Sequence, residues 1–165
     1  MKKFVLLLTT VLFSLTGCGP AEEETRTYDE YQNNHLSSLD DFFTLEYDSY
    51  FIELYQENCS HCETTKTTIF NYLDEQNKGN VKTPLFLFDL NSGNGRANRN
   101  RFKEKPSWYD GANYDALVRE MEENKPSTLN ETYFIGTPTI YEIVDHKVSQ
   151  VYVGSNEVNG VLNSQ

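Results

Sequence analysis

Hydrophobic and polar positions predict alternating strands and helices along the central part of the chain. Two runs rich in strand-forming residues, at 50–55 and 84–90, lie on either side of a stretch of helical length at 60–73. Apolar residues of that stretch fall on one helical face, and the polar run Asn77-Lys78-Gly79-Asn80 ends it. Strand, helix and strand at this spacing predict a βαβ unit with parallel strands.

Three further elements are predicted around this unit. Leucines and phenylalanines at helical spacing predict a short amphipathic helix over about 36–46. Two strand-like runs at 139–144 and 147–153 are joined by a two-residue turn, which indicates a tight hairpin although the preferred glycine is missing. The tail from Ser155 carries apolar residues at helical spacing and predicts a short closing helix.

The segment at about 91–132 differs from its surroundings and is interpreted as an insertion. It begins with loop composition, and 109–124 then forms a plausible amphipathic helix that ends before Pro126. Five basic residues gather in its first part, and we expect either a solvated flexible loop or a contact with an acidic client or an anionic surface. This basic cluster consists of Arg96, Arg99, Arg101, Lys103 and Lys105.

Composition indicates one folded domain with an acidic surface. Hydrophobic residues make up 38% of the 165 residues and aromatic residues 13%, which is enough for a packed core. The 14 basic and 25 acidic side chains give a formal net charge of -11. That charge disfavours binding to nucleic acid or anionic lipid through the whole surface, so no nucleic-acid partner is expected.

The first residues have the pattern of an export signal. Lys2 and Lys3 supply positive charge, 4–15 is apolar, and small residues precede Cys18. Twelve helical residues extend only about 18 Å, short of the roughly 30 Å hydrocarbon core of a bilayer. An ordinary cleaved signal peptide with a nearby cysteine is one interpretation of this pattern.

The run Leu-Thr-Gly-Cys at 15–18 resembles the lipobox of bacterial lipoproteins. The resemblance implies a signal peptide at 1–17, an acylated Cys18, and a mature protein anchored by lipid to the outer face of the cytoplasmic membrane. The polar, acidic residues that follow lead us to expect a flexible tether over 18–35 and one domain over 36–165.

The number of cysteines leaves one pair available for thiol chemistry. The chain has only three cysteines, so lipid on Cys18 leaves Cys59 and Cys62 in an oxidising compartment. The pair follows a predicted strand and opens a predicted helix, a context that favours a redox motif over a metal knuckle. Backbone N–H groups at the helix start stabilise a Cys59 thiolate, and Cys62 lies close enough to form the disulfide.

His61 adds a second predicted effect at the pair. Its imidazole can donate a hydrogen bond or carry positive charge near the Cys59 sulfur, which makes the disulfide a better oxidant. The competing use of this motif is zinc binding, for which His35 and His146 are the available additional ligands. A closed zinc site needs four ligands and no second cysteine pair exists, so no metal and no cofactor are expected.

The segment 52–62, Ile-Glu-Leu-Tyr-Gln-Glu-Asn-Cys-Ser-His-Cys, resembles the thioredoxin superfamily and in particular the active-site segment of protein disulfide isomerase domains. In that family the position of Glu53 holds a buried acid that moves protons for the buried cysteine. Taken without the family, Glu53 lies between apolar Ile52 and Leu54 and is expected to face water.

A second match lies in Gly136-Thr137-Pro138-Thr139, which is followed by the predicted hairpin and Gly154 and looks like the family's cis-proline loop. The resemblance implies a cis Pro138 that faces the cysteines, with Thr137 offering backbone atoms to a substrate strand. Taken alone, the bond before Pro138 is expected to be trans, since only about one X-Pro bond in twenty is cis.

Together the motifs predict an α/β, thioredoxin-like fold: a central mixed sheet flanked by helices, with a helical insertion before the cis-proline loop. The expected function is that of an extracytoplasmic thiol–disulfide oxidoreductase, more an oxidase or isomerase than a reductase. It exchanges its disulfide with client proteins and is recycled by a membrane redox partner. The alternative is a non-enzymatic lipoprotein of this fold that binds a metal ion or a protein partner.

Overall fold

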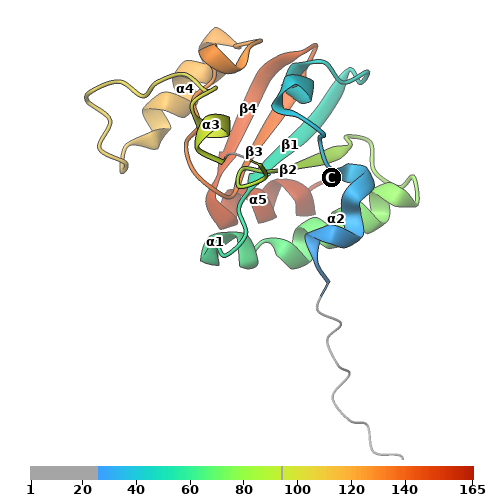
Figure 1. Cartoon of the computed structure of the whole chain (residues 1–165). Coiled ribbons are helices and arrows are strands. Elements are labelled where there is room, and N and C mark those ends of the chain that lie inside the picture. Colours follow the sequence, from blue (N-terminus) through green and yellow to red (C-terminus); the bar gives the residue numbers. More distant parts are fainter. Residues whose placement is uncertain (1–25, 94) are drawn as a thin grey trace, which may run out of the picture.

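The computed structural model describes residues 26–93 and 95–165. These residues form one four-stranded sheet with helices packed around it (Figure 1). The strands lie in the order β2-β1-β3-β4; β1 is parallel to β2 and antiparallel to β3, and β3 is antiparallel to β4. Their bounds are Ser49–Tyr55 for β1, Leu85–Asp89 for β2, Thr139–Val144 for β3 and Lys147–Val153 for β4. The predicted βαβ unit and closing hairpin are therefore confirmed.

Helices cover both faces of the sheet. The α-helices are α1 (Ser60–Glu63), α2 (Lys66–Asn77), α3 (Gly95–Arg99), α4 (Tyr114–Asn124) and α5 (Gly154–Asn163). Three short 3-10 helices are η1 (Tyr28–Asn34), η2 (Leu39–Phe43) and η3 (Leu129–Glu131). Residues of α2, α5 and η1 share one hydrophobic cluster, and residues of η2, α4 and η3 share the other. No helix among residues 26–93 and 95–165 is both long and apolar enough to cross a bilayer.

Strand β1 lies inside the sheet and is covered on both faces, which places Glu53 in the interior. Successive side chains of a strand point to opposite faces. Tyr50 and Ile52 accordingly join the cluster beneath η2 and α4, whereas Phe51 and Tyr55 join the cluster beneath α2. Glu53 has the same parity as Phe51 and Tyr55, so its side chain points to the same face of the sheet, which α2 covers.

The predicted helix at 60–73 is divided into two helices in the structure. Both the N–H and the hydroxyl of Thr65 donate to the Cys62 carbonyl, at 3.1 and 2.8 Å, and α2 starts only at Lys66. The hydroxyl competes for a carbonyl of the helix ladder, as threonine hydroxyls do. The cysteines therefore occupy a short helix of their own before the long one.

Two other predicted helices are shorter than expected. The helix at 36–46 is the 3-10 helix η2, which begins after Ser38, whose side chain accepts from the N–H of Asp40. The helix of the insertion starts at Tyr114 rather than at Tyr109, because the preceding residues form turns around Gly111. Hydrophobic spacing indicates which residues are buried but gives no sharp start for a helix.

The prediction of a flexible tether over 18–35 is wrong for residues 26–35, the part of it that the structure describes. Residues 28–34 form η1, in which Tyr28 and Tyr31 are buried, and Tyr28 stacks on Tyr55 with ring centroids 3.8 Å apart. Arg26 forms an ion pair with Asp74 of α2 at 2.9 Å. Large aromatic rings can anchor a segment that shows no periodic pattern. The domain therefore starts by Arg26, and the predicted signal peptide and Cys18 lie outside the described residues.

Candidate functional site: the cysteine pair

Cys59 is the N-cap of α1, and its sulfur lies where the helix presents unpaired N–H groups. The Cys62 N–H donates to the Cys59 Sγ at 3.2 Å, and the Thr137 hydroxyl approaches the same sulfur at 3.5 Å. Burial opposes ionisation of this thiol, but the Cys62 side chain, Thr137 and the N–H groups of Cys62 and His61 outweigh it and hold the pKa of Cys59 below its usual value. Cys59 therefore forms a thiolate more readily than an ordinary cysteine.

Cys62 lies one turn further along α1 in the opposite environment. It is buried, and burial together with the Cys59 side chain raises the pKa of Cys62 to about 12. Both cysteines are free thiols in this structure, with Cys59 partly exposed. A thiolate attacks a disulfide far more readily than a thiol does, so Cys59 is the sulfur suited to meet an external substrate.

Glu53 lies in the buried region beneath the pair. It is fully buried on β1, and neither of its carboxylate oxygens has a hydrogen-bond partner among the described residues. Burial, with a smaller contribution from Cys59, raises the pKa of Glu53 to about 8. Glu53 is therefore buried, as the family resemblance implies, whereas the expectation from its apolar neighbours alone, that it faces water, is wrong because both faces of β1 are covered.

His61 is placed differently from its predicted role. Its side chain is exposed on α1, and no hydrogen bond joins its ring to Cys59 among the described residues. Its backbone N–H contributes to lowering the pKa of Cys59, less than the Cys62 side chain, Thr137 and the Cys62 N–H do. Because every residue at this position has an N–H, the identity of the side chain matters less than the sequence suggests.

The segment 136–138 meets the cysteine pair, as the resemblance implies. The Thr137–Pro138 peptide bond is cis, and the Thr137 carbonyl lies 3.6 Å from the Cys59 Sγ, which donates to it. Residues 78 positions apart are thus brought together by the pairing of β3 with β1. The loop leaves Cys59 partly exposed.

Tyr28 is a residue of this site that the sequence analysis did not identify. It is buried, and its hydroxyl has no hydrogen-bond partner among the described residues. Burial raises the pKa of Tyr28 first of all, and the nearby charges of Glu53 and Cys62 add to the effect. In the sequence, the only indication that this position is buried is a large aromatic residue within a run that otherwise has the composition of a linker.

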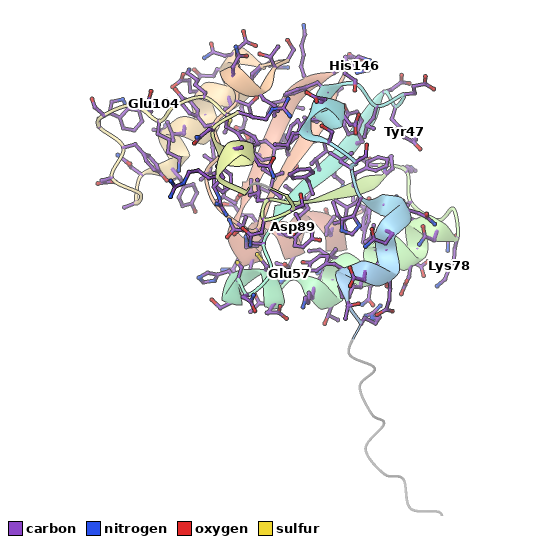
Figure 2. The ribbon with its side chains drawn as sticks, viewed as in Figure 1. Tyr47, Glu57, Lys78, Asp89, Glu104 and His146 are labelled. Atoms are coloured by element: carbon purple, nitrogen blue, oxygen red, sulfur yellow. The ribbon has the colours of Figure 1, made fainter. Side chains whose placement is uncertain are left out.

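The histidines considered as metal ligands lie apart from the pair. The His35 Nδ1 donates to the Tyr31 carbonyl at 3.0 Å, which leaves Nε2 to accept from the Tyr55 hydroxyl at 2.9 Å. His146 lies in the β3–β4 turn, at the end of the molecule opposite Glu57, which marks the cysteine end (Figure 2). Within the described residues, no three His, Cys, Asp or Glu side chains are grouped as metal ligands.

The basic cluster of the insertion is divided by the fold. Arg101 pairs with Asp40, and Lys103 pairs with Glu120 at 2.7 Å. Lys105 instead lies against the rings of Tyr109 and Phe134. The cluster is therefore not one uniform solvated patch.

No protein-family model matches the chain, and no curated protein matches it either. Two solved structures are similar to it at low identity. A yeast mitochondrial 1-Cys peroxiredoxin, studied for its thiol resolving mechanism, is 13% identical with a TM-score of 0.44, over 79% of this chain and 90% of that chain. Thioredoxin f2 of Chlamydomonas reinhardtii is 10% identical with a TM-score of 0.40, over 79% of this chain and 93% of that one.

The fold is thioredoxin-like. At such scores neither structure informs the function of this chain, which is inferred from the cysteine site itself. An ionisable thiol at a helix start and a buried thiol one turn away suggest thiol redox chemistry in this fold.

Proposed function

We propose that the protein is a thiol–disulfide oxidoreductase that uses Cys59 as its nucleophile and Cys62 as its resolving cysteine. The observation that carries the proposal is the asymmetry of the pair: the pKa of Cys59 is lowered at the helix start, whereas burial raises the pKa of Cys62 to about 12. Such an asymmetry makes one sulfur reactive toward clients and keeps the other protonated until it is needed.

The reaction proceeds in two exchanges. The Cys59 thiolate attacks one sulfur of a client disulfide, the S–S bond breaks, and the other client sulfur leaves as a thiolate. Cys62 then gives its proton to Glu53 in the minority of molecules in which that carboxyl, whose pKa is about 8, is ionised at neutral pH. The Cys62 sulfur attacks the Cys59 Sγ and displaces the second client thiolate. The same steps in reverse oxidise a client dithiol, and no cofactor is required.

The direction of electron flow follows from the stabilised thiolate. A stabilised Cys59 thiolate favours the reduced enzyme, which makes the disulfide a better oxidant. We therefore assign the protein to oxidation or isomerisation, with a potential on the order of -230 to -120 mV against about -270 mV for thioredoxin. Equilibration in glutathione buffers measures it, and a value at or below that of thioredoxin contradicts the assignment.

Location and recycling complete the proposal. The apolar start and the Leu-Thr-Gly-Cys run support an extracytoplasmic protein held by lipid on Cys18, with a membrane redox partner that recycles the pair. Intact-mass analysis of membrane fractions is the test, with a Cys18→Ala chain as control. An unmodified Cys18 thiol in the mature protein contradicts the anchor.

A further inference from the structure

A pocket in the insertion lies beside the loop that contacts Cys59. It has a volume of about 490 Å³ and is called the basic pocket here. Its lining includes Arg99, Phe102, Lys103, Glu104, Lys105 and Phe134. In Figure 1 the insertion that forms it lies on one side of the sheet, above α1, and Glu104 marks its outer part in Figure 2.

Lys105 connects the basic pocket to the cis-proline loop. Its Nζ donates to the Ile135 carbonyl at 3.3 Å, two residues before Thr137, whose carbonyl lies 3.6 Å from the Cys59 Sγ. Two residues of chain extend at most about 7 Å, so the Lys105 ammonium lies within about 15 Å of the Cys59 sulfur. An extended client covers this distance in at most about four or five residues.

The charges that line the basic pocket are not balanced within the chain. Lys103 is paired with Glu120, so Arg99 and Lys105 face one exposed carboxylate, that of Glu104. No described carboxylate lies within ion-pair distance of Lys105 or Arg99; the Arg99 guanidinium donates to the Asn91 side chain at 3.0 Å. The basic pocket therefore carries an excess of positive charge, although the chain as a whole has a formal net charge of -11.

Lys105 is also partly desolvated. Its Nζ lies 4.6 Å from the ring centroid of Tyr109 and 5.7 Å from that of Phe134, and burial lowers the pKa of Lys105. Two aromatic rings and one carbonyl stabilise an ammonium less than a carboxylate does, because a carboxylate forms a charge-assisted hydrogen bond with it. The Lys105 ammonium, which has no carboxylate partner among the described residues, is therefore available to bind a carboxylate of a ligand.

We propose that the basic pocket is a client subsite, in which Lys105 and Arg99 bind an acidic side chain within about four or five residues of the client's reacting cysteine. This inference rests on the proposed thiol exchange, because it names the class of client that Cys59 meets. The Lys105 ammonium at the pocket lies within about 15 Å of the reacting sulfur, and the pairing of Arg101 and Lys103 leaves few cations for a flat anionic surface. An acidic polypeptide is therefore the favoured occupant.

The test uses single-turnover attack by Cys59 on activated peptides. The protein is the full chain carrying Cys18→Ala and Cys62→Ser, so that Cys59 is the only thiol. Each peptide has one cysteine bound as a disulfide to thionitrobenzoate, with Glu, Gln or Lys three residues away. The Cys59 thiolate attacks the peptide sulfur, the S–S bond breaks, and thionitrobenzoate leaves as a coloured thiolate. Each rate is divided by the rate of the same variant with hydroxyethyl disulfide, so that changes in Cys59 reactivity cancel.

We expect the Glu peptide to react about 2- to 5-fold faster than the Gln peptide, as a partly exposed ion pair permits. Lys105→Gln should remove this preference, and Lys105→Glu should transfer it to the Lys peptide. The matched control is Lys82→Gln, an exposed lysine between α2 and β2, which should keep the preference for Glu.

Two results overturn the inference. One is an equal preference for Glu in the parent and in Lys105→Gln. The other is a Lys105→Gln chain that loses binding to phosphatidylglycerol vesicles but keeps its peptide preference, which assigns the basic pocket to a membrane surface. Failure of the proposed function is distinguishable, because the parent then reacts with neither the peptides nor hydroxyethyl disulfide.

Discussion

The exposed rim of the cysteine site and the buried region beneath it impose opposite protonation states on two sulfurs one helical turn apart. The rim consists of Cys59, the N–H groups of α1 and the segment 136–138, and it stabilises a thiolate. The buried region contains Cys62, Glu53 and Tyr28, and it holds all three in their neutral forms. Burial is the largest single influence on the pKa of both cysteines, so hydrogen bonds decide the difference.

This difference teaches that the motif alone does not assign the roles of its two sulfurs. Both cysteines belong to one short helix, yet only the first lies where free N–H groups converge. The second is buried in the apolar cluster beneath α2. Substitutions that remove one side of the comparison should therefore have unequal effects.

The largest effect is expected from exchanging either sulfur for oxygen. Cys59→Ser should abolish disulfide exchange, whereas Cys62→Ser should still attack clients and accumulate mixed disulfides, because only the resolving step is lost. Non-reducing electrophoresis after incubation with a disulfide client distinguishes them, in a Cys18→Ala chain. Mixed disulfides that accumulate with Cys59→Ser instead would assign the roles the other way round.

Glu53→Gln should change how stability depends on pH. The pKa of Glu53 is raised from 4.5 to about 8, so between these values the unfolded chain ionises this group and the folded chain does not. Stability that is present below pH 4.5 is then lost as pH rises toward 8, by up to about 4 to 5 kcal/mol for a shift of this size. Gln stays neutral and should lack this loss.

The measurement is urea unfolding of the reduced wild type and Glu53→Gln at pH 5 to 8. Other groups titrate in both proteins, so the difference between the two free energies of unfolding isolates Glu53. A difference that does not vary with pH would contradict the raised pKa. Glu53→Gln should also slow the resolving step, about 10- to 100-fold, because Cys62 loses its proton acceptor.

Tyr28→Ala should destabilise the reduced domain by about 3 to 5 kcal/mol, the usual cost of removing a buried aromatic ring. It removes the ring stacked on Tyr55 and leaves a cavity above Glu53. Tyr28→Phe is the matched control and should be neutral or stabilising, because the lost hydroxyl is buried without a described partner. Thermal unfolding of both variants gives the comparison, and a large cost for Tyr28→Phe would indicate a bonded hydroxyl.

Thr137→Val should raise the pKa of Cys59. The substitution removes one hydrogen bond to the sulfur but keeps the shape of the side chain and the backbone carbonyl. Thr137→Ser keeps a hydroxyl and should leave the pKa near its original value. Iodoacetamide alkylation rates against pH measure the change, and an equal shift in both variants would point to packing rather than to the hydrogen bond.

His61→Ala should have the smallest effect on the site. The imidazole is exposed and the contribution to Cys59 comes from the backbone N–H, which Ala retains. We expect the reduction potential to shift by less than about 30 mV, the equivalent of 1.4 kcal/mol for a two-electron couple. A more reducing potential by 30 to 60 mV in glutathione buffers would show that the imidazole acts on the sulfur after all.

Much of the fold could be predicted because strand runs and the cysteine motif are local patterns. The four strands begin and end within a residue or two of the predicted runs, since β-branched and aromatic residues concentrate in them. Helix starts were predicted less well. The division at Thr65 depends on a hydroxyl that bonds to a specific carbonyl, and 3-10 geometry at 39–43 depends on caps. Neither appears in hydrophobic spacing.

The N-terminal segment and the insertion show the limit more clearly. Both have polar composition, yet Tyr28 and Tyr31 dock η1 against α2, and Lys105 reaches the carbonyl of Ile135. A single aromatic or cationic side chain decides each contact, and its partner lies tens of residues away. No pattern within a window of the sequence carries that information.

The sequence by itself determined where the four strands lie along the chain and that Cys59-Ser60-His61-Cys62 stands at a helix start. It also determined the resemblance of two distant motifs to one superfamily. These follow from local periodicity and from backbone N–H groups that any helix start presents. Tertiary structure alone decided that Glu53 is buried, that Thr137 contacts Cys59, and that Lys105 lacks a carboxylate partner in the described chain. The reason is physical: burial and electrostatic pairing depend on which segments pack together, and those segments are far apart in the sequence.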